Sequence, residues 1–206
     1  MKRLQALLFA LATIAALQVR AAGGPLGIDH PITYDNDGLV HRKLQLFVED
    51  ATLLALVGGA LWEGGDSRLG KTYWRAIDAS LLGVASSSAL KYAFSRSRPA
   101  QSSNPDLWLQ GKGHYSFPSG EVTFVTAAVT PFVIEYAHDH PAVWALEALP
   151  LYDAIARVKI GGHWQTDVLA GFALGTAAGY LASKPDQPYT LLAMPRGIAI
   201  GFKKQF

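Results

Sequence analysis

The sequence contains no cysteine among its 206 residues. This absence excludes thiol catalysis, thiolate metal sites and disulfide bridges, so the fold must be stabilised by packing alone. Net charge is also small: the formal charge of +2 gives no basic footprint for nucleic acid, so we expect no nucleic-acid partner. Half of the residues are hydrophobic, and the length suits one domain with a substantial core.

Long uncharged hydrophobic runs are missing beyond the N-terminal segment. The longest stretches without Asp, Glu, Lys or Arg hold 12, 12, 13 and 16 residues and cover 51–62, 79–90, 122–134 and 168–183. A membrane-spanning helix needs about 20 largely apolar residues, so the pattern favours buried helices of a soluble or peripheral bundle. Short or tilted membrane spans remain the alternative, because 168–183 is apolar all round.

The first 21 residues are typical of a secretory signal peptide. A short positive start precedes an uncharged stretch rich in Leu and Ala, residues 4–19, and small side chains precede a cut after Ala21. We therefore expect residues 1–21 to direct export to the periplasm and residues 22–206 to form a single domain. A retained membrane anchor is the alternative, because Arg20 is unusual so close to a cut.

Helical patterns dominate the rest of the chain and predict an all-α fold, a bundle of about five to six core helices. The expected helices cover 44–62, 74–94, 119 to about 137, about 142 to 158, and 163 or 165 to 181. Pro131 and Pro150 lie inside two of them and predict a kink or an early end.

Two further patterns concern the packing and the ends of the domain. Gly171, Gly175 and Gly179 leave one helix face nearly bare, so a neighbouring helix can approach it closely. Residues 23–41 show no clear period and predict an extended N-terminal arm. Residues 197–206 alternate apolar with small or polar side chains and suggest a short C-terminal strand.

Three separate clusters carry the groups needed to bind and attack a phosphate. The first is Lys91-x6-Arg98-Pro99. The ammonium of Lys91 supplies a point charge near a helix end, and the guanidinium of Arg98 can bind two phosphate oxygens at once. Taken singly, each is more often a solvated surface cation.

The second cluster, Phe117-Pro118-Ser119-Gly120-Glu121, is typical of a helix start. Serine is a favoured N-cap residue, and the free N–H groups of a helix N-terminus bind anions. Gly120 would let a phosphate come close to the backbone. Taken alone, an ordinary helix cap is the simpler interpretation.

The third cluster is Arg157-x5-His163-x3-Asp167. The four-residue gap places His163 and Asp167 on one helix face, where the carboxylate can fix the imidazole tautomer and leave one nitrogen free as a nucleophile. Gly161 and Gly162 permit a sharp turn that lets Arg157 converge on the same point. Alone, the His–Asp pair would be a surface pair; the set of three clusters favours a phosphate site.

Together the clusters resemble the type 2 phosphatidic acid phosphatase superfamily, which includes lipid phosphatases, bacterial class A acid phosphatases and vanadium haloperoxidases. The family pattern is Lys-x6-Arg-Pro, then Pro-Ser-Gly-His, then Ser-Arg-x5-His-x3-Asp. The match runs from Lys91 to Asp167, with Ala156 where Ser is usual and Glu121 where the family has His. Residues 22–70 and the C-terminal tail carry no motif.

The resemblance implies a helical bundle of the haloperoxidase type and metal-independent hydrolysis of phosphate monoesters or diphosphates, with lipid phosphates or prenyl diphosphates favoured. It implies that His163 attacks phosphorus to form a phosphohistidine and that Asp167 orients it. The implied phosphate-binding residues are Lys91, Arg98, Ser119, Gly120 and Arg157. The resemblance implies no metal or other cofactor, and vanadate would act as an inhibitor or phosphate mimic.

Glu121 is the most consequential departure from the family pattern, because the His at this position in the family protonates the leaving oxygen. A carboxyl group that is protonated through burial and like-charge repulsion can do the same. The alternative is a structural first-turn acid that leaves the site weakened. His114, in the loop before Ser119, is a third candidate as a substitute acid.

Three functions follow. An exported phosphatase is favoured, which acts either on lipid phosphates at the membrane surface or on soluble phosphate esters. A phosphate- or phospholipid-binding protein without turnover is the alternative that Glu121 suggests. A vanadium-dependent haloperoxidase is disfavoured, because those enzymes are usually much longer. Trp108 could contact a lipid chain, but we expect it to anchor its loop in the core.

Overall fold

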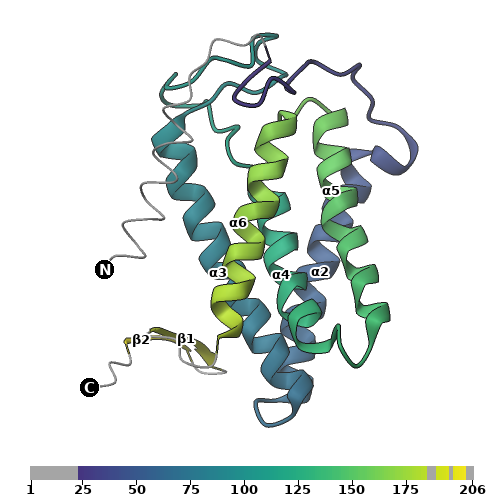
Figure 1. The fold of residues 1–206 in the computed structure, drawn as a ribbon, viewed down its shortest axis with the longest axis vertical. Coiled ribbons are helices and arrows are strands. Elements are labelled where there is room, and N and C mark those ends of the chain that lie inside the picture. Colours follow the sequence, from purple (N-terminus) through teal and green to yellow (C-terminus); the bar gives the residue numbers. More distant parts are fainter. Residues whose placement is uncertain (1–22, 185–188, 195–196, 203–206) are drawn as a thin grey trace.

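The computed structural model describes residues 23–184, 189–194 and 197–202. The expected signal peptide and the final residues of the tail therefore lie outside the described residues. The described chain forms an all-helical bundle, as the sequence predicts, and carries a small C-terminal hairpin (Figure 1). Its α-helices are α2 (Arg42–Glu63), α3 (Arg68–Phe94), α4 (Gly120–Tyr136), α5 (Ala148–Lys159) and α6 (Gln165–Ser183).

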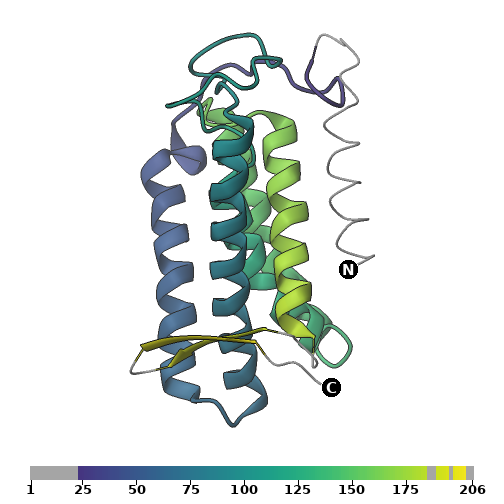
Figure 2. The ribbon, with the colours of Figure 1, turned by 90° about the vertical axis from the view of Figure 1, so that its left-hand side faces the viewer.

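Successive helices run in alternating directions, and the long loops gather at one end of the bundle (Figure 1). The starts of α2, α4 and α6 and the ends of α3 and α5 therefore meet at this end. Figure 2 shows α3 between α2 and α6 on one side of the bundle. This topology brings the three sequence clusters together, because each lies at one of these helix ends.

Helix α4 forms the centre of the bundle. It packs most extensively against α6 and α3, and ten of its residues, from Val122 to Val133, are buried. The glycine stripe of α6 lies against it: a methyl group at Gly175 would lie 2.6 Å from the carbonyl oxygen of Thr123. The close approach that the sequence predicts is thus confirmed. It fixes the start of α4 relative to the start of α6.

Some expected boundaries are wrong. Helix α3 begins six residues earlier than expected, at Arg68, because the Ser67 hydroxyl accepts a hydrogen bond from the backbone N–H of Gly70. Pro131 does not end α4 early, since the helix continues to Tyr136.

The fourth expected helix is divided into two. A 3-10 helix, η2 (Pro141–Glu147), precedes α5. Pro150 lies in the first turn of α5, where a backbone N–H has no intrahelical partner to lose. The proline therefore helps to start a helix here instead of kinking one.

Helix α2 differs from the expectation of uniformly buried helices. It is long and apolar enough to cross a membrane, and only 17% of that apolar stretch is buried inside the bundle. Counting uncharged runs did not identify α2 as a helix of this kind, because Glu49 and Asp50 interrupt its apolar sequence. Both acidic residues line a pocket within the fold. Leu54 and Trp62 are among its exposed side chains.

The segments at the two ends of the described chain are also partly as predicted. Residues 23–37 form an extended arm, which a short 3-10 helix, η1 (Gly38–Val40), joins to α2. The tail forms strand β2 (Gly197–Phe202), paired antiparallel with β1 (Tyr189–Met194), which was not predicted. The hairpin contacts α3 near the end opposite the loops (Figure 2).

Candidate active site

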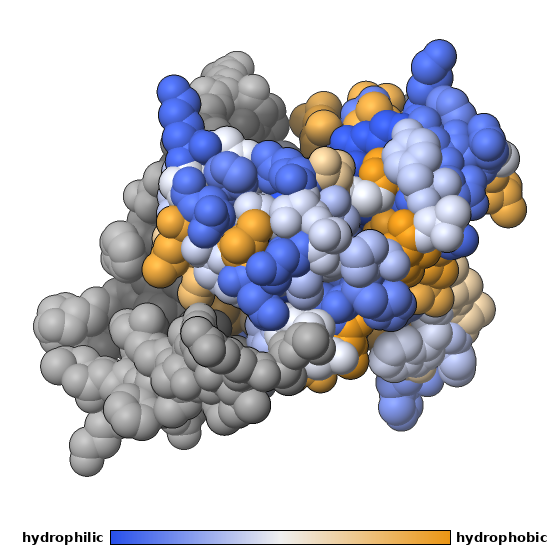
Figure 3. Space-filling view, turned by 90° about the horizontal axis from the view of Figure 1, so that it is seen from above, coloured by the Kyte–Doolittle hydropathy of each residue, from blue (hydrophilic) through white to orange (hydrophobic). Residues whose placement is uncertain are grey.

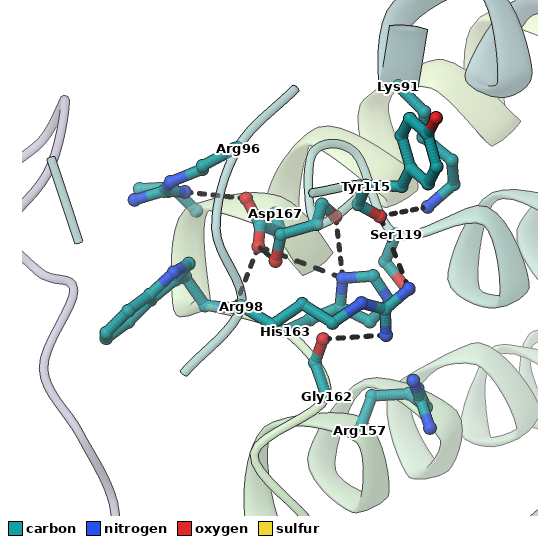
Figure 4. A network of polar contacts seen from close by, with 12 residues as sticks. Lys91, Arg96, Arg98, Tyr115, Ser119, Arg157, Gly162, His163 and Asp167 are labelled. Carbon is teal, nitrogen blue, oxygen red and sulfur yellow. Dashed lines mark hydrogen bonds and ion pairs between the residues drawn. The ribbon is translucent and has the colours of Figure 1, made fainter. Parts of the chain in front are cut away.

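His163 lies at the centre of the converging helix ends (Figure 4). Its side chain is 2% exposed, and its Nδ1 lies 2.7 Å from the carbonyl oxygen of Ser116. A carbonyl oxygen only accepts, so Nδ1 carries the proton and Nε2 keeps a free lone pair. Burial, reinforced by the nearby cations of Arg157 and Lys91, lowers the pKa of His163 to about 4. The ring is therefore neutral at physiological pH, as a nucleophile must be.

Asp167 supports this histidine, but not by the contact that the sequence suggests. Its Oδ2 lies 3.8 Å from His163 Nδ1, which is too far for a hydrogen bond. Asp167 instead accepts hydrogen bonds from the Ser116 hydroxyl at 2.5 Å and from the backbone N–H of Trp164 at 2.9 Å. The carboxylate thus holds the residue whose carbonyl orients the ring, and its proximity opposes the fall in the pKa of His163.

Sequence reasoning missed the buried cation that neutralises Asp167. Arg96 is fully buried and lies 2.6 Å from a carboxylate oxygen of Asp167 and 2.6 Å from one of Asp29. Its guanidinium also stacks over the ring of Trp108, 4.3 Å from the centroid. Burial alone would raise the pKa of Asp167, yet the nearby His163, Arg96 and the Ser116 hydroxyl hold that pKa below its ordinary value.

The N-terminal arm reaches the site through Asp29. Its carboxylate accepts hydrogen bonds from the backbone N–H and the hydroxyl of Thr166, at 2.8 and 2.6 Å, in the first turn of α6. The neighbouring His30 exchanges two hydrogen bonds with Gln165. The arm is thus the cap of the helix that carries Asp167, a role that no motif in residues 23–41 indicated.

Four residues from the first two clusters form what we call the oxyanion cradle: Lys91, Arg98, Ser119 and Gly120. Lys91 Nζ and Arg98 both donate to the carbonyl oxygen of Tyr115, at 3.0 and 3.3 Å, and Arg98 also donates to that of Gly162 at 3.0 Å (Figure 4). These backbone contacts hold the two cations side by side. Burial, then repulsion from Arg98, lowers the pKa of Lys91 to about 8, so the ammonium is still charged at neutral pH.

The helix start supplies the neutral part of the oxyanion cradle. The Ser119 hydroxyl is buried and makes no hydrogen bond within the described residues. Gly120 opens α4, and a methyl group there would lie 3.2 Å from the Cε of Lys91. A buried hydroxyl without a partner is costly, so a bound oxygen of a tetrahedral oxyanion would supply the missing hydrogen bond.

Arg157 packs flat against the turn before His163. A methyl group at Gly162 would lie 2.5 Å from its guanidinium, so a larger residue there would force the Arg157 side chain to shift. Its Nε lies 2.6 Å from Oε2 of Glu121, an ion pair without hydrogen-bond alignment. The predicted phosphate ligand is therefore paired with an internal carboxylate in this structure.

Glu121 is held by a second arginine that the sequence did not single out. Arg42, at the start of α2, donates to both oxygens of Glu121, at 2.6 and 2.9 Å. Burial would raise the pKa of Glu121, but Arg42 and Arg157 outweigh it and lower that pKa. Glu121 is thus a carboxylate, which favours the structural interpretation over the acid catalyst.

A pocket of about 420 Å³ opens beside these groups. Its walls come from α2, α3, the start of α4 and the loops, and they include Glu49, Leu53, Val84, Lys91, Arg98, Gly120, Glu121, Phe124 and His163. The polar residues lie at the loop end of the bundle. Figure 3 shows that this end is largely hydrophilic, with hydrophobic residues at its margins.

Two loop residues from the sequence analysis lie away from this pocket. His114 pairs with the Ser97 hydroxyl at 2.9 Å and is not among the described residues that form the pocket wall. Trp108 packs edge-on against Phe94 and Phe117, with centroids 5.9 and 5.2 Å apart. The expectation that Trp108 anchors its loop is confirmed.

The donor set suits an oxyanion better than a metal ion. Among the described residues, no group of three or more His, Asp or Glu side chains is arranged to hold a metal. Two cations, a free hydroxyl and a helix N-terminus instead match the oxygens of phosphate or vanadate. Fold and site together define an α-helical bundle that presents a neutral histidine beside an oxyanion cradle.

Comparison with known proteins places the chain in a family. The family model described as the PAP2 superfamily matches residues 72–187, more than half of the chain, and the protein belongs to this superfamily. Two curated proteins are each 30% identical: an undecaprenyl-diphosphatase of Sulfolobus acidocaldarius over 93 residues and a lipid A 1-phosphatase of Porphyromonas gingivalis over 118. These matches cover 45% and 54% of this chain but only 44% and 24% of those proteins.

Two solved structures also resemble this fold. LpxE of Aquifex aeolicus aligns with a TM-score of 0.49 and 18% identity over 69% of this chain and 86% of its own. The first transmembrane PAP2 type phosphatidylglycerolphosphate phosphatase from Bacillus subtilis aligns with a TM-score of 0.44 and 19% identity, over 87% of this chain and 92% of its own.

Proposed function

We propose that this protein is a metal-independent phosphatase that hydrolyses phosphate monoesters or diphosphates through a phosphohistidine on His163. One observation carries the proposal: a buried, neutral imidazole with its proton on Nδ1 lines the same pocket as Lys91 and Arg98. Nε2 would attack phosphorus while the oxyanion cradle holds the oxygens on which charge develops. Water would then release phosphate and restore the ring.

A phosphorylated lipid or prenyl diphosphate is the favoured substrate class. The pocket continues from the cations to the apolar side chains of Leu53, Val84 and Phe124, which suit a hydrocarbon chain next to a phosphate. The names of both curated relatives specify phosphorylated lipids or their diphosphates. Exposed apolar residues on α2, such as Leu54, would contact the membrane that holds such a substrate. Export by residues 1–21 is part of the same proposal.

A phosphate-binding protein without turnover is the second candidate. Its support is the ionised state of Glu121, which leaves the position of the family's acid without a proton to give. Such a protein would bind phosphate through the oxyanion cradle but release none from an ester.

Phosphate release by the purified full chain separates these functions. The substrates are phosphatidic acid, a prenyl diphosphate and nitrophenyl phosphate, each assayed with and without a chelator. We expect turnover that chelation leaves unchanged and that His163→Ala abolishes. Phosphate binding without release from any substrate would establish the second candidate instead.

A further inference from the structure

The proposed reaction needs a proton for the leaving oxygen, and neither candidate from the sequence is placed to supply it. Glu121 is an ionised partner of two arginines, and His114 is bonded to Ser97 away from the pocket wall. An alkoxide of high pKa leaves slowly without protonation. Another acid in the pocket wall would therefore have to supply this proton.

The described part of the pocket wall offers two further acids, Glu49 and Asp50; Asp50 is exposed, whereas Glu49 is half-buried. Glu49 lies on α2 and faces the same pocket as His163 and the oxyanion cradle. Its Oε2 accepts a long hydrogen bond, 3.4 Å, from the amide of Gln45. No arginine or lysine within the described residues forms an ion pair with it, in contrast to Glu121.

The surroundings of Glu49 favour the protonated form. Burial raises its pKa to about 7, and the negative charges of Glu121 and Asp153 act in the same direction against Arg42. Gln45 is itself buried and bonded to Asp153 and Arg42, so it is held in place. The charged and titratable groups around the pocket and its rear wall are Arg42, Asp50, Lys91, Arg98, Glu121, Asp153, Arg157 and His163.

We propose that Glu49 is the proton donor to the leaving oxygen, and that Glu121 is a fixed anion that ties α2 to the site through Arg42. This inference rests on the proposed phosphatase function. It explains why a carboxylate can stand where the family has an acid: the ion pair of Glu121 with Arg42 lies on the same helix, seven residues before Glu49. About two helical turns separate those two positions, so they share one face of α2.

The proposed reaction moves one phosphoryl group and one proton in each half. Nε2 of His163 forms a bond to phosphorus as the bond from phosphorus to the leaving oxygen breaks. The carboxylic acid of Glu49 gives its proton to that oxygen and becomes a carboxylate. In the second half, the Glu49 carboxylate takes a proton from water as the hydroxide attacks phosphohistidine. Inorganic phosphate leaves, and both residues return to their starting states.

Leaving groups of different basicity test the assignment. Glu49→Gln keeps the shape of the side chain and the hydrogen bond with Gln45 but cannot give up a proton in this way. We expect kcat/KM for an alkyl monophosphate to fall about 100- to 10,000-fold. Turnover of nitrophenyl phosphate, whose leaving group needs little protonation, should fall less than about tenfold.

Two controls accompany this comparison. Glu63→Gln changes an acid at the opposite end of α2 and should leave both substrates unaffected. Inhibition by vanadate should be the same in Glu49→Gln as in the unmodified protein, which shows that the oxyanion cradle is intact. The basic limb of the pH profile for the alkyl substrate should move from about 7, the Glu49 pKa, to about 8, the Lys91 pKa, in Glu49→Gln.

Equal loss on both substrates, or no loss on either, would overturn the Glu49 assignment. So would a selective loss of alkyl turnover in Glu121→Gln instead of Glu49→Gln. If the proposed phosphatase function itself is wrong, the unmodified protein will show no more turnover than His163→Ala on any of the substrates.

Discussion

The charge state of His163 decides what the site can do at the scale of single residues. The Ser116 carbonyl fixes the proton on Nδ1, while burial opposes a second proton. Asp167 stabilises this arrangement from behind Ser116, and Arg96 neutralises Asp167. The result is a neutral nucleophile surrounded by cations, which keep the ring unprotonated when a phosphate anion binds beside it.

The first prediction concerns the titration of His163. Its imidazole should remain neutral until the pH falls to about 4, against an ordinary value of 6.5. Nitrogen chemical shifts of the labelled ring would follow this directly. Because the unfolded chain binds the proton at higher pH than the folded chain, this residue should lower stability as the pH falls from 6.5 towards 4. A ring that becomes protonated at or above 6.5 would contradict this account.

The second prediction concerns Arg96. Arg96→Met removes the cation between Asp29 and Asp167 and leaves two buried carboxylates unpaired. The free energy of unfolding in urea should fall by about 3–5 kcal/mol. Arg68→Met is the matched control, because Arg68 pairs with Glu135 and Asp139 at the surface. A loss no larger than that of the control would show that the buried pairs contribute little.

Sequence reasoning predicted which motif residues meet but not what connects them. Arg96 stands between Lys91 and Arg98, yet its partner Asp29 lies 67 residues earlier in an arm without periodicity. The acceptor for His163 is the backbone carbonyl of Ser116, and any residue type provides one. Such contacts depend on how loops fold, so spacing within motifs does not contain them.

At the scale of helices, the contact of α4 with α6 sets the geometry of the site. Ser119 and Gly120 open one helix, and Asp167 lies in the first turn of the other. The bare glycine face allows their backbones to approach closely, and the backbone N–H of Ser119 donates to the carbonyl oxygen of Asp167 at 2.9 Å. A change in helix separation would therefore move the oxyanion cradle away from the histidine.

The third prediction tests this contact. Gly175→Ala places a methyl group 2.6 Å from the Thr123 carbonyl oxygen and should destabilise the fold by about 1–3 kcal/mol. Gly58→Ala, in α2, meets no atom within 4 Å and should stabilise it by about 0.5–1 kcal/mol. Denaturant unfolding of the two variants measures both effects. Equal and small changes would mean that the stripe does not fix the helix spacing.

The helices themselves were largely predictable, because long apolar segments extend through most of them. The boundaries were less so: the Ser67 cap lengthened α3, and Pro150 began a helix where a kink was expected. Sequence reasoning missed Arg42, because this residue ties α2 to Glu121 through an ion pair and belongs to no motif.

At the scale of the whole molecule, polar and apolar surfaces are separated along the bundle. The loop end that holds the site is largely hydrophilic (Figure 3), whereas α2 exposes large apolar side chains along its length. Counting uncharged runs did not predict this, because Glu49 and Asp50 interrupt the apolar sequence of α2 while their side chains face the pocket. A lipid whose headgroup enters the pocket would meet this apolar surface with its chain.

The fourth prediction follows from that separation. The full chain should float with phosphatidylcholine vesicles, and Leu54→Lys should reduce the bound fraction severalfold, because Leu54 is 72% exposed on α2. Leu26→Lys changes an equally exposed leucine, 68%, in the N-terminal arm and should have little effect. If both variants bind as the unmodified chain does, α2 is not the lipid contact.

Trapping the covalent intermediate tests the central claim most directly. The protein would be mixed with nitrophenyl phosphate, quenched in alkali within milliseconds and digested for mass spectrometry. We predict an acid-labile phosphate on the peptide that contains His163. Its phosphorus NMR shift should identify Nε2 as the site of attachment, and the adduct should be absent from His163→Ala. Rapid phosphate release by the unmodified protein without that adduct, or turnover that survives His163→Ala, would contradict the account.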